Sequence, residues 1–311
     1  MRDHLPPKIL ITGADGFLGS QVVGVTRAAG FSVWRLGRNC VGDKSIVADI
    51  REPGDWQDQV AAECFDAVFH LAGAPRSGNR DVLEGLHVAG TRHLISALNT
   101  KKIWILVASS SGVYGGVSSV HFPITEDYLA APVGDYATSK LQQEQLALSI
   151  GSKSESLGVC VARLSNLIGP GQSRHFLFGH VVGEIANQAQ SADSPNLIHV
   201  GSLSGTRDFI DVRDAALALL ALFNRRADGV FNVATGKETW LRGALTAFLE
   251  KVSEKSSLAE DLSGVASPIQ RQLLSIKKLT QTTGWVPTIS AEESLIGMLH
   301  AALEDRSNSL R

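Results

Sequence analysis

The amino-acid sequence predicts an α/β fold in which helices cover both faces of a doubly wound parallel sheet. Through the first half of the chain, short apolar runs alternate with longer segments of helical periodicity, which is the pattern of β-α-β units. A turn rich in glycine follows the first apolar run directly, as it does in Rossmann-type sheets. After Gly169-Pro170-Gly171 the alternation weakens, which indicates a second, smaller and less regular domain.

Six apolar runs are predicted to be the strands of this sheet. They are Ile9–Thr12, Ser32–Leu36, Ser45–Val47, Ala67–Leu71, Ile103–Ala108 and Val159–Leu164. The helix after the first strand is expected to end at Ala29, with Gly30 as its stop. Apolar spacing predicts an amphipathic helix over Val82–Leu98, and the run Val230–Val233 is expected to rejoin the sheet.

Composition and charge exclude several classes of protein. The chain has 311 residues, 44% of them hydrophobic, so it can bury a substantial core. Its 29 basic residues nearly balance 31 acidic ones and form no basic run, so we expect neither nucleic acid nor a membrane as partner. The sequence shows no spanning segment and no signal-peptide hydrophobic region, which predicts a cytoplasmic protein. Its three cysteines lack metal-ligand spacing, and we predict no metal site.

The glycine-rich turn is the first candidate site. Gly13, Gly16 and Gly19 follow a strand and open a helix. Glycines there allow a tight turn and close approach of the backbone to a pyrophosphate, and the helix N-terminus offers unpaired N–H donors. We therefore predict a dinucleotide coenzyme contacted by these glycines and by Phe17 and Leu18. The alternative is an ordinary glycine turn of an α/β loop.

The residues after the second strand bear on which coenzyme binds. An NAD site usually carries an acidic residue about 20 residues beyond the glycines. Here the chain has Gly37 and Arg38, and the planar donors of an arginine suit the 2′-phosphate of NADP. We therefore predict NADP, with NAD possible; alternatively Arg38 is a solvated surface residue. Asp49 and Ile50 are placed to meet the adenine, unless Asp49 caps the following helix.

A tyrosine and a lysine form the candidate catalytic pair. Tyr136 and Lys140 are four residues apart and share one face of a helix. A free tyrosine has a pKa near 10, but a neighbouring ammonium favours its phenolate and makes it a better acid–base catalyst. The pair alone could be surface decoration. Serines at the end of the fifth predicted strand, where ligands of open α/β sheets bind, favour the catalytic interpretation.

Motifs spread over nearly the whole chain carry a family resemblance. They are Thr12-Gly13-x-x-Gly16-x-x-Gly19, His70-Leu71-Ala72-Gly73, Ser109-Ser110-Ser111-Gly112-Val113-Tyr114-Gly115, Tyr136-x-x-x-Lys140, Arg163-Leu164-Ser165-Asn166, Arg207-Asp208-Phe209 and Gly284-Trp285-Val286-Pro287. Together they resemble the extended short-chain dehydrogenase/reductase family, also known as the NAD-dependent epimerase/dehydratase family. This resemblance implies an NAD(P)-dependent oxidoreductase that acts on a nucleotide sugar.

The resemblance also implies roles for individual residues. Ser110, three residues before Val113, matches the catalytic serine, and Lys140 would also bind the nicotinamide ribose, as Tyr136 would contact the coenzyme. Asn166 and Arg207 match residues that contact the phosphates or base of the nucleotide sugar. We add Ser111 to this substrate site, and Leu71, Ala72 and Gly73 to the coenzyme site.

One residue departs from the family pattern. The family often has Asn-Val-x-Gly-Thr on the helix after the fourth strand, where this chain has His87-Val88-Ala89-Gly90-Thr91. We interpret His87 as a packing or hydrogen-bonding replacement rather than a new catalytic group.

The family resemblance leaves three reactions to compare. Dehydration is disfavoured because Ser111 and Gly112 stand where related dehydratases carry an acidic residue. Reduction is favoured over 4-epimerisation with bound NAD, because Gly37-Arg38 suggests NADP and because the later motifs resemble the GDP-4-keto-6-deoxy-mannose reductase subgroup. The preferred function is thus an NADP-dependent reductase of a 4-keto nucleotide sugar. A cofactor-sensing protein without catalysis is a further alternative.

The predicted domains follow from these assignments. Residues 1–165 and 205–235 are expected to form the dinucleotide-binding Rossmann domain, and residues 166–204 and 236–311 the substrate-binding domain. The resemblance implies a homodimer formed through the helices that carry Thr91 and Tyr136. Leu141, Leu146 and Leu148 would suit such an interface or simple core packing.

Overall fold

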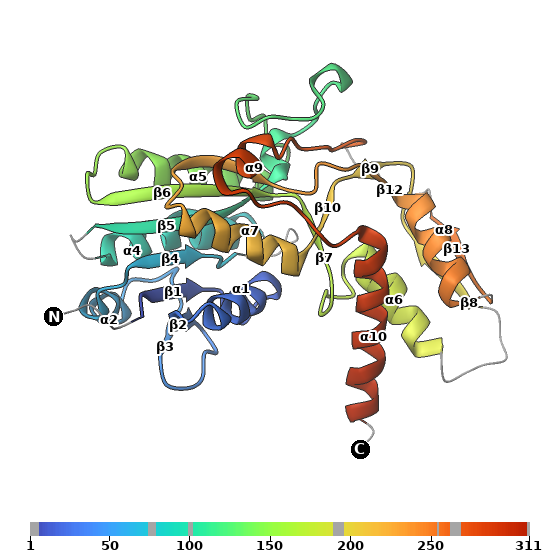
Figure 1. The fold of residues 1–311 in the computed structure, drawn as a ribbon, viewed down its shortest axis with the longest axis horizontal. Coiled ribbons are helices and arrows are strands. Elements are labelled where there is room, and N and C mark those ends of the chain that lie inside the picture. The colour runs from blue at the N-terminus through green and yellow to red at the C-terminus, as the bar shows by residue number, and fades with distance from the viewer. Residues whose placement is uncertain are drawn as a thin grey trace.

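A seven-stranded parallel sheet forms the centre of the protein in a computed structural model, which describes residues 6–73, 79–98, 102–188, 196–253, 255–261 and 269–309 (Figure 1). The strand order is β11-β6-β5-β4-β1-β2-β3, and every pairing is parallel. The strands are β1 Lys8–Thr12, β2 Ser32–Gly37, β3 Ser45–Val47, β4 Ala67–His70, β5 Ile103–Ser110, β6 Leu157–Leu164 and β11 Gly229–Val233. The order reverses between β1 and β4, so the sheet is doubly wound.

All six predicted strands and the returning seventh are therefore confirmed. Two strands are two residues longer than predicted: β6 begins at Leu157, and β5 continues to Ser110, so that Ser109 and Ser110 belong to the strand. β11 pairs with β6 along its whole length, from Gly229 opposite Cys160 to Val233 opposite Leu164.

Helices cover both faces of the sheet because its strands alternate their apolar side chains between two cores. On β1, Ile9 and Ile11 face one core and Leu10 faces the other. The first core is closed by α1 (Phe17–Ala28) and α7 (Val212–Asn224), which lie in front of the sheet in Figure 1. The second is closed by α2 (Trp56–Glu63), α4 (Gly90–Ala97) and α5 (Asp135–Gly151).

The helix predicted over Val82–Leu98 is not a regular α-helix. It comprises α3 (Arg80–Glu84), a π-helical turn over Gly85–Ala89, and α4. A π turn inserts one extra residue into a helix and so changes which side chains face inward. Here it places the side chain of His87 in the protein interior. The predicted stop of α1 is confirmed, since Ala29 caps the helix and Gly30 has φ +86°.

Most of the remaining elements gather beside the carboxyl ends of the sheet strands, whereas α9 (Lys277–Thr283) packs over the sheet through Leu279, in the first core (Figure 1). Those beside the strand ends include α6 (Leu177–Gln188), α8 (Leu241–Val252) and α10 (Ala291–Ser309), with the short strands β7 (Asn166–Ile168), β8 (Asn196–Val200), β9 (Thr206–Arg207), β10 (Phe209–Asp211), β12 (Thr239–Trp240) and β13 (Ser256–Glu260). Helices α6, α8 and α10 share an apolar core of their own around Phe178, Phe248 and Leu295. Within the described ranges, no helix is both long and apolar enough to cross a membrane.

Candidate active site

The glycine-rich turn connects β1 to α1 at the carboxyl edge of the sheet. Gly13 has φ +65°, and a Cβ atom there would lie 2.8 Å from the backbone nitrogen of Ala72. A Cβ atom at Gly19 would overlap the carbonyl oxygen of Gly13. Side chains are thus excluded from both positions, and the N-terminus of α1 is open at Gly16, its N-cap. This turn has the geometry that phosphate groups need.

A pocket of about 250 Å³ extends from this turn across β2 and β3. Its lining includes six of the predicted coenzyme contacts: Gly13, Arg38, Asp49, Ile50, Ala72 and Gly73. Gly16 and Phe17 lie at the adjoining helix start, and the side chains of Phe17, Leu18 and Leu71 pack on the sheet core. Arg38 is exposed at the rim of the pocket.

The carboxylate of Asp49 is hydrogen-bonded to an arginine that the sequence motifs did not indicate. Its carboxylate accepts hydrogen bonds from the guanidinium group of Arg51 at 2.6 to 3.0 Å and from the Arg51 backbone N–H at 3.1 Å. The hydrogen bonds from Arg51 lower the pKa of Asp49. The expectation that Asp49 might cap the next helix is wrong, because α2 begins at Trp56 with Asp55 as its N-cap.

Tyr136 lies in the first turn of α5 and lines a second pocket, of about 260 Å³. The same pocket is lined by Gly112, Asn166, Arg207 and Gln272. The structure thus brings Tyr136 together with Asn166 and Arg207, two of the three predicted substrate contacts, although they follow it by about 30 and 70 residues in the sequence. The two pockets also lie close to each other. Gly73 lines the first pocket, and a Cβ atom at that position would lie 3.6 Å from Nζ of Lys140, which is one helical turn beyond Tyr136 of the second pocket.

The serines at the end of β5 lie beside this second pocket. Oγ of Ser110 accepts a hydrogen bond from the backbone N–H of Gly112 at 3.1 Å. Ser111 is buried and donates to Oε1 of Gln272 at 3.1 Å, and the amide group of Asn166 donates to the same oxygen at 3.0 Å. Gln272 therefore holds two predicted substrate residues together. No sequence signal pointed to it, since it lies far from both along the chain.

Among the described residues that line the second pocket, Arg207 is the only cation. Its guanidinium group donates to the backbone carbonyls of Thr206, at 2.8 Å, and Gln270, at 3.1 Å, and to that of Ile269. These contacts hold the positive charge at the pocket rim, where an anionic ligand group would meet it.

Lys140 is almost completely buried beneath Tyr136 on α5. Its ammonium group donates to the carbonyl of Ala108 at 2.8 Å and to Oε1 of Gln143 at 3.0 Å. Burial lowers the pKa of Lys140 to about 7, and the nearby carboxylate of Glu144 opposes that change. Lys140 therefore changes charge close to neutral pH.

His87 is a hydrogen-bonding residue of the protein interior, as interpreted from the sequence. Its Nδ1 lies 2.8 Å from Oγ of Ser139, which in turn donates to the carbonyl of Tyr136 at 2.9 Å. The imidazole ring meets the ring of Tyr136 edge to face, with 5.7 Å between the centroids. Burial lowers the pKa of His87 to about 2, so the ring is neutral at pH 7. It supports the first turn of α5 from the π-helical side.

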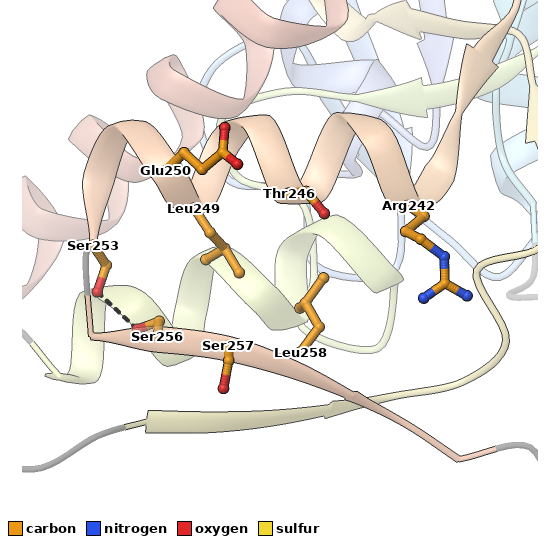
Figure 2. Close-up of a pocket in the computed structure, with 8 residues that line it drawn as sticks. All are labelled: Arg242, Thr246, Leu249, Glu250, Ser253, Ser256, Ser257 and Leu258. Carbon is orange, nitrogen blue, oxygen red and sulfur yellow. Dashed lines mark hydrogen bonds between the residues drawn. The ribbon is translucent and has the colours of Figure 1, made fainter.

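A third pocket, of about 530 Å³, lies between α8 and β13, away from these residues (Figure 2). Three of its polar side chains, those of Arg242, Ser253 and Ser256, are bonded within the protein. Ser253 and Ser256 lie 2.8 Å apart between their hydroxyl oxygens, Ser256 also donates to Gln188, and Arg242 forms an ion pair with Glu260. Because the lining residues that the structure describes include no convergent acid–base pair, the chemistry points to the Tyr136 pocket instead.

The fold and these two adjoining pockets define a class of protein: a dinucleotide-binding α/β protein with a tyrosine–lysine pair at the carboxyl edge of its sheet. The chain belongs to the NAD dependent epimerase/dehydratase family, whose sequence model matches residues 9–234. The family resemblance identified from the motifs is thereby confirmed.

Individual relatives are similar over nearly their whole length. GDP-6-deoxy-D-mannose reductase of Pseudomonas aeruginosa is 33% identical over 94% of this chain and 96% of its own length. The structure of RMD from Pseudomonas aeruginosa, complexed with NADPH, has a TM-score of 0.83 at 29% identity, covering 95% of this chain and 99% of the other. UDP-glucose 4-epimerase of Thermus thermophilus, in complex with NAD, has a TM-score of 0.76 at 25% identity, covering 95% and 98%.

Proposed function

We propose that the protein is an NADP-dependent reductase of a 4-keto nucleotide sugar. The observation that carries this proposal is the position of Tyr136: it lines a pocket with Asn166 and Arg207, and the lysine one turn further on reaches the edge of the coenzyme pocket at Gly73. A proton donor, an anion-binding group and a coenzyme site therefore adjoin one another. The similarity to GDP-6-deoxy-D-mannose reductase supports the same reaction class.

The first pocket fits a dinucleotide coenzyme. The turn from Gly13 to Gly19 leaves room that a Cβ atom would fill, and the start of α1 offers N–H donors to a pyrophosphate. Arg38 is the residue we assign to a 2′-phosphate, while Ile50 and the Asp49–Arg51 pair lie where an adenine would be held. When bound, NADPH supplies the hydride for the reduction.

The residues of the chain then handle the proton. Ser110 and Tyr136 hydrogen-bond the 4-keto oxygen of the sugar and so favour the charge that develops there. Tyr136 donates its phenolic proton to the developing alkoxide. The ammonium group of Lys140 stabilises the phenolate that remains. Ser111, Asn166 and Arg207 would hold the nucleotide part of the substrate, with the regions 166–204 and 236–311 as the substrate-binding domain.

The finer identity of the substrate and the assembly are part of the same proposal. A sugar like GDP-4-keto-6-deoxymannose is the substrate that the similarity supports. We also propose a cytoplasmic homodimer formed through α4 and α5. Leu141 and Leu148 pack partly against cores of their own chain, so the dimer proposal does not rest on them. Light scattering that gives the mass of one 33.1 kDa chain would contradict it.

Absorbance at 340 nm tests the reaction directly. The protein is mixed with NADPH and a small panel of 4-keto nucleotide sugars, and oxidation of NADPH with a stoichiometric alcohol product is the expected result. Conversion of a nucleotide sugar without net oxidation would identify a 4-epimerase instead. Coenzyme binding without any conversion would favour the cofactor-sensing alternative.

Replacing Arg38 by alanine tests the choice of NADP. Loss of a charge-assisted hydrogen bond to a 2′-phosphate costs about 1.5–3 kcal/mol, so Kd for NADPH should rise by about tenfold or more while Kd for NADH stays unchanged. Arg27→Ala, at an exposed position in the last turn of α1, serves as the matched control. If the affinities for NADPH and NADH fall equally, or if neither changes, Arg38 does not bind the 2′-phosphate.

A further inference from the structure

We infer that Gln143 is a positioning residue for Lys140, and that Thr91 and His70 fix the orientation of its amide group through a directed chain of hydrogen bonds. The importance of this chain for catalysis rests on the function proposed above. The chain itself rests on the bonds of five buried residues between the coenzyme turn and α5.

Gln143 is completely buried, and both ends of its amide are bonded. One end lies 3.0 Å from Nζ of Lys140 and the other lies 2.9 Å from Oγ1 of Thr91. The oxygen and nitrogen of such an amide are assigned from their bonding partners. An ammonium group only donates, so the end that faces Lys140 has to be the oxygen. The question is what prevents the amide from turning over.

Thr91 prevents the amide of Gln143 from turning over, because the single hydroxyl proton of Thr91 is already donated elsewhere. Its Oγ1 donates that proton to the carbonyl of His87 at 2.5 Å. The same oxygen lies 2.8 Å from Nε2 of His70 and 2.9 Å from the amide of Gln143, and with its proton used it accepts from both. Gln143 therefore has to present its N–H₂ group to Thr91, which leaves its oxygen for Lys140.

His70 continues the chain of hydrogen bonds, and its ring can satisfy both of its neighbours in one tautomer. Burial lowers the pKa of His70 to about 3, so the ring is neutral and has one N–H. That proton is on Nε2, toward Thr91, and Nδ1 accepts from the hydroxyl of Thr12 at 2.8 Å. Oγ1 of Thr12 accepts in turn from the backbone N–H of Ala72 at 3.1 Å. The chain thus runs from the lining of the coenzyme pocket to Lys140, and each donor has one acceptor.

The chain fixes the rotation of the ammonium group. Gln143 and the carbonyl of Ala108 accept two of its three N–H bonds, so the direction of the third is set. Among the described residues, the ionisable groups that interact with Lys140 are Glu144 on α5, His70 on β4 and His87 on the π-helical turn. Tyr136 lies one helical turn before Lys140 on α5, and Glu144 is itself paired with Arg163. Both histidines are neutral. The neutral oxygen of Gln143 therefore adds an acceptor that stabilises the charged form of Lys140.

Titration of Lys140 tests this directly in the whole protein without substrate or coenzyme. Lysines labelled with ¹³C at Cε are followed by NMR, and Lys140→Met identifies the signal. Gln143→Leu removes the acceptor and should lower the pKa of Lys140 by about one unit or more, whereas Gln143→Glu adds a carboxylate and should raise it by a similar amount. Gln142→Leu and Gln142→Glu, at the exposed neighbouring position, are the matched controls and should change nothing.

Variants of Thr91 test the orientation of the amide. Thr91→Val removes the acceptor that holds the N–H₂ group, so the pKa of Lys140 should fall as in Gln143→Leu, and the double variant should fall no further. Thr91→Ser keeps the hydroxyl and should titrate like the natural protein. An unchanged pKa in Thr91→Val, or additive shifts in the double variant, would overturn the inference.

Kinetics separate this inference from the proposed function. If the protein reduces a 4-keto nucleotide sugar, the pH at which turnover declines on the alkaline side should move with the pKa of Lys140 in each variant. If no such sugar is reduced, the proposed function fails, but the NMR titrations still decide whether Gln143 and Thr91 control Lys140.

Discussion

Replacing Tyr136 by phenylalanine is expected to lower turnover by about a hundredfold to ten-thousandfold, the range that general acid catalysis usually contributes. The change removes only the hydroxyl group. The ring keeps its edge-to-face contact with His87, and the backbone carbonyl of Tyr136 keeps its bond from Ser139. Lys140 keeps both of its acceptors, so the first turns of α5 should be undisturbed.

Three measurements are needed to read this result. Turnover comes from absorbance at 340 nm, coenzyme affinity from titration with NADPH, and folding from the thermal midpoint, and only turnover should change. Tyr128→Phe is the control, since Tyr128 contacts Tyr114 and His121 away from Lys140. Turnover near the natural value in Tyr136→Phe would refute the assigned role, because it would show that the phenolic hydroxyl removed by the change is not the proton donor.

The sheet could be predicted from the sequence because each strand is specified by local pattern. The strands of a sheet covered on both faces are apolar runs, and β1, β4 and β5 are buried along almost their whole length. The π-helical turn at Gly85–Ala89 could not be predicted in this way. Its apolar spacing resembles that of an α-helix, and tertiary contacts such as the bond from His87 to Ser139 stabilise the extra residue.

The residues of the candidate site likewise fall into those that local sequence spacing predicts and those that only the folded structure reveals. Gly13, Gly19, Tyr136 and Lys140 were found because their function depends on spacing within one turn or one helix. Gln272 was missed because its partners Ser111 and Asn166 are more than one hundred residues away, so only the folded chain brings them together. Arg51 and Gln143 carried weak signals, two residues after Asp49 and three residues after Lys140. Neither forms part of a motif with a known mechanism.

Replacing Glu144 by glutamine is expected to destabilise the protein by about 3–5 kcal/mol, the usual effect of breaking a buried ion pair. The side chains of Glu144 and Arg163 are 1% and 8% exposed, and two guanidinium nitrogens of Arg163 donate to the carboxylate, the shortest bond being 2.8 Å. Glutamine keeps the shape but leaves the positive charge of Arg163 uncompensated in the interior.

The substitution should also disturb the active site. The hydroxyl of Ser109 donates to Glu144, and Ser109 directly precedes Ser110 on β5. Urea unfolding followed by circular dichroism measures the loss, and Glu292→Gln is the matched control. Glu292 pairs with Lys251 at the surface, where both side chains are more than half exposed, so its loss should cost less than about 1 kcal/mol. Similar losses of stability in the two variants would show that burial does not strengthen the Glu144–Arg163 ion pair. A much larger loss in Glu144→Gln would show that this buried pair contributes strongly to the packing of α5 against β6.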